Sequence, residues 1–150
     1  MDKNKKFLDV AYEEALKAYK KGEVPVGAVI VKEDKIVSKG HNLRLNKNNP
    51  LYHAEVVAIQ KASKKLKNWR LDDCILYVTL EPCLMCVGAI QQSRIKKVIF
   101  SALDEKGGCV LSKYQIFDDK KLPFKIEYEF IEDKRSSKLL KQFFKERRQK

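Results

Sequence analysis

A buried strand that runs directly into a helix is the feature of this sequence that most constrains its fold. Residues 74–80 form an apolar run without polar alternation. Such a run is typical of a strand in the middle of a sheet that helices cover on both faces. Pro82 suits the first turn of a helix, which we expect to run from Cys83 to about Gln92. The segment therefore predicts a strand–helix unit of an α/β domain.

The other segments extend this pattern along the chain. Apolar residues at helical spacing predict a first helix from Phe7 to Tyr19, ending near Gly22. Residues 24–31 and 36–40 predict a β-hairpin. The remaining predicted elements are a helix over residues 53–66, strands over 97–100 and 124–130, and a last helix from near Asp133. Strands joined through helices favour right-handed parallel crossovers. We expect one α/β domain over residues 1–150, a five-stranded mixed sheet with helices on both faces.

Composition narrows the class of protein. The chain has 150 residues, the size of one domain, and its hydrophobic content of 44% is enough for a core. No apolar run approaches the roughly 20 residues of a membrane span, and the N-terminal segment does not resemble a secretory signal. We therefore expect a cytoplasmic protein, in which thiols stay reduced. In that compartment, metal binding explains a close pair of cysteines better than a disulfide does.

The charge of the chain favours a polyanionic partner. The net charge is +12, and residues 134–150 hold eight basic residues against one acidic residue. Basic residues that gather on one helix are typical of nucleic-acid binding. A lysine-rich surface can also serve solubility alone, so charge by itself leaves both interpretations open.

Two short segments carry side chains that bind metal ions. Cys83 and Cys86 lie three positions apart at the start of a predicted helix, about 60° apart around its axis, so both sulfurs can reach one ion. His53 adds a nitrogen, and two sulfurs with one nitrogen suit zinc. Three protein ligands leave a fourth position for water, as in catalytic zinc sites. Glu55 faces away from His53 on the helix and can transfer a proton beside the ion.

A closed structural zinc site is the alternative interpretation. Cys74, Cys109 or His41 would then supply a fourth ligand. Glu55 would be a solvated helix residue, and its spacing from the histidine would have no explanation. Cys74 and Cys109 are more typical of small buried apolar side chains.

The two motifs resemble a known signature. His53-Ala54-Glu55 and Pro82-Cys83-Leu84-Met85-Cys86 are similar to the H-x-E and P-C-x-x-C motifs of zinc-dependent nucleoside and nucleobase deaminases. The flanking segments resemble the bacterial tRNA-specific adenosine deaminases; they are residues 23–28, 76–83, 93–95 and 143–148. The resemblance covers nearly the whole chain and implies a three-layer α-β-α, cytidine-deaminase-like fold with one zinc ion per subunit.

The resemblance also implies a reaction and a set of site residues. The reaction would be hydrolytic deamination of adenosine to inosine at wobble position 34 of a tRNA anticodon, by a homodimer that binds the anticodon stem-loop. His53, Cys83 and Cys86 would bind zinc, and Glu55 would transfer the proton. The expected substrate contacts are Asn42 for the sugar, Val26 and Ala54 for the base, Asp104 for the backbone of the target nucleotide, and Phe144, Arg147 and Arg148 for the stem-loop.

Other interpretations of these residues stay open at the level of sequence. Without the resemblance, Asn42 and Asp104 are equally well explained as turn residues. The chain also departs from the family at Tyr52, His41 and Leu103, where relatives have alanine, tryptophan and arginine. Two other functions remain: a deaminase of guanine, cytosine or free nucleosides, and a zinc-stabilised RNA-binding module without catalysis.

Overall fold

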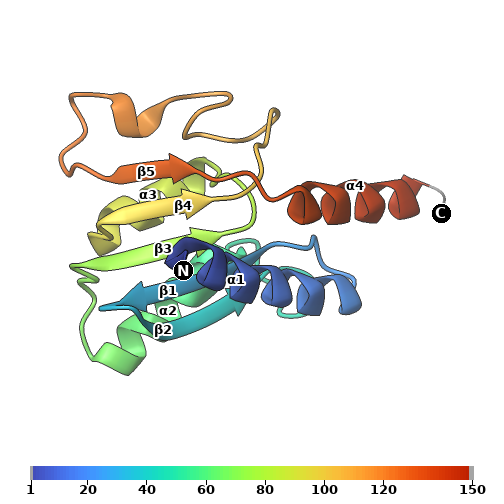
Figure 1. Ribbon diagram of the computed structural model, residues 1–150, viewed down its shortest axis with the longest axis horizontal. Helices are drawn as coiled ribbons and strands as arrows, with labels where there is room; N and C mark the ends of the chain where they lie inside the picture. Colours follow the sequence, from blue (N-terminus) through green and yellow to red (C-terminus); the bar gives the residue numbers. More distant parts are fainter. Residues whose placement is uncertain (1, 149–150) are drawn as a thin grey trace.

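A computed structural model describes residues 2–148 as a five-stranded mixed sheet between layers of helices (Figure 1). The strand order is β2-β1-β3-β4-β5. β1 is antiparallel to both of its neighbours, whereas β3, β4 and β5 are parallel. The strands are β1 (Gly27–Lys32), β2 (Lys35–His41), β3 (Cys74–Val78), β4 (Lys97–Phe100) and β5 (Glu127–Phe130). The predicted hairpin and the five-stranded mixed sheet are confirmed.

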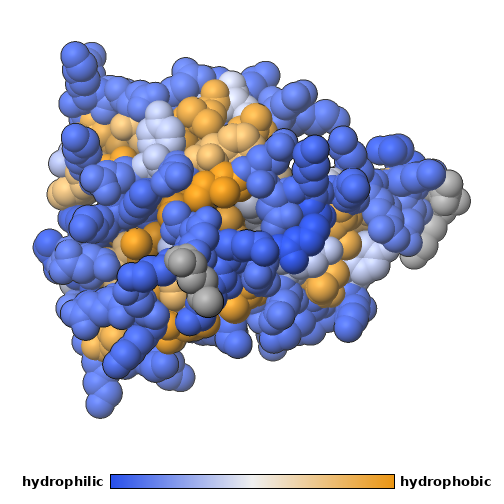
Figure 2. All heavy atoms as spheres, in the orientation of Figure 1, coloured by the Kyte–Doolittle hydropathy of each residue, from blue (hydrophilic) through white to orange (hydrophobic). Residues whose placement is uncertain are grey.

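The helices cover both faces of this sheet. α2 (Ala54–Leu66) and α3 (Leu84–Ser93) lie on one face, and α1 (Lys3–Lys20) lies on the other (Figure 1). α4 (Lys134–Arg148) extends past the carboxyl ends of β4 and β5 and reaches the end of α1, where the rings of Tyr19 and Phe143 are 6.3 Å apart. In the same orientation, hydrophilic side chains cover the outer surfaces of α1 and α4 (Figure 2).

The alternation of side chains along β1 divides the core in two. Ala28 and Ile30 face the α2 and α3 side. Val29 and Val31 face the opposite side and pack with Phe7 of α1. Because successive strand residues point to opposite faces, one continuous apolar run can supply both cores. This is why the central strands carry no polar face.

Two strands begin later in the structure than the sequence predicts. Residues 24–26 do not belong to β1, which begins at Gly27. Pro25 has no N–H group to give to a neighbouring strand, and Val26 donates its own N–H to the carbonyl of Val24 in a tight turn. Likewise, β5 begins at Glu127 and not at Phe124, whose carbonyl accepts a hydrogen bond from Gln91.

Among residues 2–148, no helix has the length and apolar character needed to cross a membrane.

Candidate metal centre

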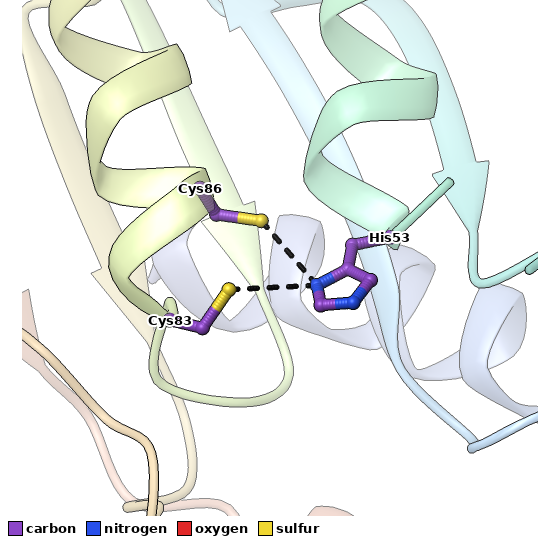
Figure 3. Close-up of side chains that lie close together, drawn as sticks. All are labelled: His53, Cys83 and Cys86. Atoms are coloured by element: carbon purple, nitrogen blue, oxygen red, sulfur yellow. Dashed lines mark hydrogen bonds between the residues drawn. The ribbon is translucent and has the colours of Figure 1, made fainter. Parts of the chain in front are cut away.

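His53, Cys83 and Cys86 meet between the first turns of α2 and α3 (Figure 3). Both sulfurs lie 3.6 Å from His53 Nδ1. The three potential ligand atoms all lie within 4.8 Å of one another. The structure therefore brings together residues that are far apart in the sequence, as the two motifs predict.

The spacing of these atoms fits a zinc ion. Zinc binds thiolate sulfur at about 2.3 Å and histidine nitrogen at about 2.0–2.1 Å, usually with tetrahedral angles, which places sulfur and nitrogen about 3.6 Å apart. Both sulfur–nitrogen distances in the protein are 3.6 Å. One imidazole and two thiolates are also the donor set that zinc prefers.

The pKa values of the two thiols are shifted in opposite directions. The hydrogen bond from Cys86 is the largest influence on Cys83 and lowers the pKa of its thiol to about 4, with a further contribution from His53. The same contact with Cys83, together with burial, raises the pKa of Cys86. The ionised form of Cys83 is therefore favoured, and a cation bound by both sulfurs would displace the remaining thiol proton.

Of the residues considered for a fourth ligand, Cys74 lies in the apolar core, and His41 and Cys109 make other contacts. His41 lies between Glu14 and Lys21, at 2.9 and 3.0 Å from their side chains. The Cys109 thiol donates to the carbonyl of Gly107 at 3.5 Å. Throughout residues 2–148, the three-residue group is the one set of at least three histidine, cysteine or acidic side chains close enough to share an ion. Three protein ligands are typical of a catalytic zinc site and not of a closed structural one.

Glu55 lies beside the ligand group without joining it. It is the second residue of α2 and only 4% exposed, and its carboxyl group lies near Cys86 and His53. Burial raises the pKa of Glu55 to about 7. A carboxyl group with such a pKa can both accept and donate a proton near neutral pH.

The structure also brings together the residues predicted for the base and sugar. The Asn42 N–H donates to the carbonyl of Val26 at 3.2 Å, and both side chains are buried. Gly40 lies against the carbonyl of Ala54, so this end of β2 adjoins the first turn of α2. Asn42 Oδ1 also accepts from Arg44 N–H at 3.2 Å, so it has the predicted turn role as well.

The residues predicted to hold the RNA lie on two segments. Asp104 Oδ1 accepts from the N–H groups of Lys106 and Gly107, both at 3.2 Å, and so closes its own turn. On α4, Phe144 is 45% exposed, whereas Phe143 is buried. Arg148, also on α4, is exposed.

Arg147 ties α4 to the end of α1. Its guanidinium group donates to the carbonyl of Gly22 at 2.6 Å and lies over the ring of Phe143. Arg147 therefore has a structural contact in addition to the RNA contact that the sequence predicts.

Sequence reasoning missed two buried glutamates in the loops around the site. Glu23 is 1% exposed, and its carboxylate accepts from the backbone N–H groups of Leu45 and Asn46. Glu81 is 2% exposed and binds the loop that follows β4. For Glu81, the only signal in the sequence was its position as an acidic residue between an apolar strand and the proline of the P-C-x-x-C motif.

Comparisons with known proteins agree with this geometry. Residues 1–102 match the family described as the cytidine and deoxycytidylate deaminase zinc-binding region. The chain is 50% identical over 142 residues to a tRNA-specific adenosine deaminase of Aquifex aeolicus, covering 95% of this chain and 94% of that one. The family and the three-residue group together confirm the predicted zinc cofactor.

Solved structures give the same fold. A chain from a study of A-to-I editing by tRNA A34 deaminases superposes with a TM-score of 0.87 at 33% identity, covering 91% of this chain and 99% of that chain. The guanine deaminase of Bacillus subtilis, also 33% identical, superposes with a TM-score of 0.64 and covers 94% and 93%. The predicted cytidine-deaminase-like fold is therefore confirmed.

Proposed function

The chain belongs to the cytidine and deoxycytidylate deaminase zinc-binding family, and on that premise we propose that it converts adenosine to inosine at the wobble position of tRNA. The structural observation that carries the proposal is the three-ligand group with Glu55 buried beside Cys86. The resemblance to tRNA-specific adenosine deaminases over nearly the full length then selects the substrate.

Different residues of the chain would bind the metal and transfer the proton. His53, Cys83 and Cys86 would hold zinc, which when bound supplies Lewis-acid activation of water. Glu55 accepts a proton from the water that attacks C6 of adenine and donates it to the exocyclic amine. Water and adenosine thereby give inosine and ammonia. Burial of Glu55 suits both proton transfers, since its pKa of about 7 makes either protonation state accessible.

The remaining site residues would bind and orient the nucleotide. We assign the sugar to Asn42, and the walls of the base pocket to Val26 and the backbone of Ala54. Asp104 contacts the backbone of the target nucleotide. An anticodon-loop base can leave its stack and enter such a pocket, because loops are where RNA bases are accessible.

The basic helix α4 would bind the anticodon stem-loop. Phe144, Arg147 and Arg148 lie near its end, and all three are exposed. Arginines contact phosphates, and exposed aromatic rings stack on unpaired bases. The tRNA-specific relatives make a tRNA anticodon stem-loop the partner that best fits this helix.

We further propose that residues 1–150 form one domain and that the protein is a homodimer. We place it in the cytoplasm, where tRNA is found. Leu51, Leu84 and Leu111 are 54%, 63% and 37% exposed and adjoin the metal-binding segments in sequence or through the Glu81 contact. Exposed apolar side chains around one site are typical of an interface. A monomer in sedimentation at micromolar concentration would contradict the dimer, and cell fractionation tests the location.

An RNA substrate with a readable product tests the function. The protein is incubated with an anticodon stem-loop that carries A34, and the product is reverse-transcribed, because inosine is read as guanosine. We expect conversion at A34 and not at other adenosines. Glu55→Gln should keep its zinc and lose activity by a factor of roughly 10²–10⁴, the usual contribution of a general acid–base group.

The same preparation separates the alternatives. Release of ammonia from guanine, cytosine or free adenosine, with A34 untouched, would favour the small-molecule deaminase that the guanine deaminase structure represents. If the wild type shows no turnover at all, and the Glu55→Gln variant binds RNA as tightly as the wild type does, the result would favour an RNA-binding module. Glu129→Gln, an exposed carboxylate paired with Lys97 on the sheet edge, is the matched control and should remain fully active.

A further inference from the structure

Five hydrogen bonds converge on the buried carboxylate of Glu81. Oε2 accepts from three successive backbone N–H groups in residues 110–112, at 3.0, 2.8 and 2.9 Å. Oε1 accepts from the Asp104 N–H at 3.1 Å and from the Ser112 hydroxyl at 2.5 Å. Successive N–H groups that point at one oxygen form an anion-binding nest, here filled by a side chain of the same protein.

The backbone on either side of Glu81 binds the same loop. Its own N–H donates to the carbonyl of Ala102 at 2.8 Å, and the carbonyl of Pro82 accepts from Cys109 N–H at 2.9 Å. Gly108 passes so close that an added Cβ would collide with the Glu81 carboxyl group. Residues 102–112 are thus fastened to the segment that leads into Cys83.

We propose that Glu81 is a positioning residue, which holds Asp104 in a fixed relation to the metal ligand Cys83. Asp104 lies within the fastened loop, and Cys83 lies two residues after Glu81 in a segment without flexible glycine. The RNA-contacting wall and the metal centre would then move as one unit. The proposal rests on the proposed function in one respect, namely that Asp104 contacts the target nucleotide.

The chemistry of the contacts requires a carboxylate at this position. All four N–H groups are donors only, so neither oxygen of Glu81 can be replaced by an amide nitrogen without loss. Glutamine could still offer its oxygen to residues 110–112. Its NH₂ group would then face the Asp104 N–H, whereas the Ser112 hydroxyl could rotate to accept. Glu81→Gln should therefore release Asp104 selectively.

Hydrogen exchange tests this without any RNA. In zinc-loaded Glu81→Gln, we expect faster exchange of the amide of Asp104 and of its neighbours in residues 104–109, with residues 110–112 less affected and the zinc content unchanged. Ser112→Ala, a milder change, removes one bond to Oε1 and should loosen the loop less. Glu129→Gln is the control and should exchange like the wild type. Unchanged exchange in both Glu81→Gln and Ser112→Ala would overturn the proposal.

A double-mutant cycle then asks whether Glu81 acts through Asp104. Glu81→Gln and Asp104→Ala should each raise KM for the A34 stem-loop about tenfold, the usual effect of one lost hydrogen bond, with kcat nearly unchanged. The double variant should also lose about tenfold and not a hundredfold. Additive losses, or an equal fall of kcat in both single variants, would overturn the positioning role.

The two assays separate this proposal from the proposed function. If the wild type does not convert A34, the proposed function fails. In that case the exchange experiment still decides whether Glu81 fixes the loop, and selective loosening near Asp104 would support it.

Discussion

His53 and Cys83 occupy the same position in two different helices. Each is the N-cap residue, in extended conformation, and neither side chain makes the hydrogen bond by which a cap usually closes the first turn. Instead, the Cys83 sulfur lies 3.6 Å from His53 Nδ1. The positive ends of both helices are thereby directed at the ligand group, where they favour the thiolate over the thiol. An ion bound by both residues would therefore fix the starts of α2 and α3 relative to one another.

Removal of zinc should therefore destabilise the whole domain. An ion present at about 100 times its dissociation constant stabilises the folded state by about 2.7 kcal/mol. For a domain of this size, that corresponds to a fall in Tm of roughly 5–10 °C on chelation. Calorimetry with and without chelator measures the fall, and added zinc should restore the original Tm.

Cysteine variants provide the control for this prediction. Cys83→Ala should lose zinc and with it the response to chelator. Cys109→Ala alters a buried thiol outside the ligand group and should retain one zinc per chain. A Cys83→Ala protein that keeps its full zinc content would contradict the ligand assignment.

The Glu14 carboxylate should make stability depend on pH in the acid range. Burial alone would raise its pKa, but hydrogen bonds from His41 and Lys17 outweigh burial and lower the pKa from 4.5 to about 2. Because the folded-state pKa is the lower one, the ionised group stabilises the fold above pH 5 and loses this effect as the pH falls toward 2. A fall in pKa from 4.5 to about 2 corresponds to roughly 3 kcal/mol.

Urea denaturation at several pH values tests that contribution. The difference in unfolding free energy between wild type and Glu14→Gln should be largest above pH 5 and shrink in more acidic solution. Glu13→Gln, the exposed neighbour on α1, should follow the wild type at every pH. A difference that stayed constant from pH 7 to pH 3 would show that packing, and not charge, is responsible.

Two adjacent arginines on α4 should behave differently. Arg147 is tied to Gly22 and stacked on Phe143, so Arg147→Ala should lower Tm as well as RNA affinity. Arg148→Ala should weaken RNA binding and reduce the salt dependence by about one phosphate contact, with Tm unchanged. Binding titrations at several salt concentrations measure both effects. Arg70→Ala, beside β3, should leave RNA binding intact, and a weakening equal to that of Arg148→Ala would argue against α4 as the specific grip.

Local patterns account for what the sequence could predict. The ligands Cys83 and Cys86 are three residues apart at one helix start, so helix geometry alone places their sulfurs together. The continuous apolar strand at residues 74–78 requires cover on both faces, which predicts the layers. His53 could be added because its motif and the cysteine motif have a recognisable joint signature.

Contacts between distant segments account for what was missed. Glu81 binds backbone groups 23 to 31 residues further along the chain, and no periodicity marks such partners. The partner of Arg147 lies 125 residues away, at the end of α1. The early start assigned to β1 has a local cause, since apolar residues around Pro25 look like strand although proline cannot join the ladder.

Two glycine-to-alanine substitutions should differ in effect, because one glycine lies in close contact with helix α2 and the other faces open space. A Cβ on Gly40 would lie 2.8 Å from the carbonyl of Ala54 and from the N–H of Ala58, both in the backbone of α2. Neither atom can move without shifting the helix that follows His53. Gly40→Ala should therefore destabilise the protein by about 1–3 kcal/mol, as overpacking does, and weaken zinc binding.

Gly88 in the middle of α3 is the matched control. A Cβ there meets nothing within 4 Å, and alanine is favoured over glycine inside a helix by up to about 1 kcal/mol. Gly88→Ala should therefore keep or raise Tm, with zinc affinity unchanged. Competition with a chromophoric chelator measures affinity in both variants. Equal zinc affinity in Gly40→Ala and the wild type would mean that the first turn of α2 adjusts independently of β2, because only a shift of that turn connects Gly40 with His53.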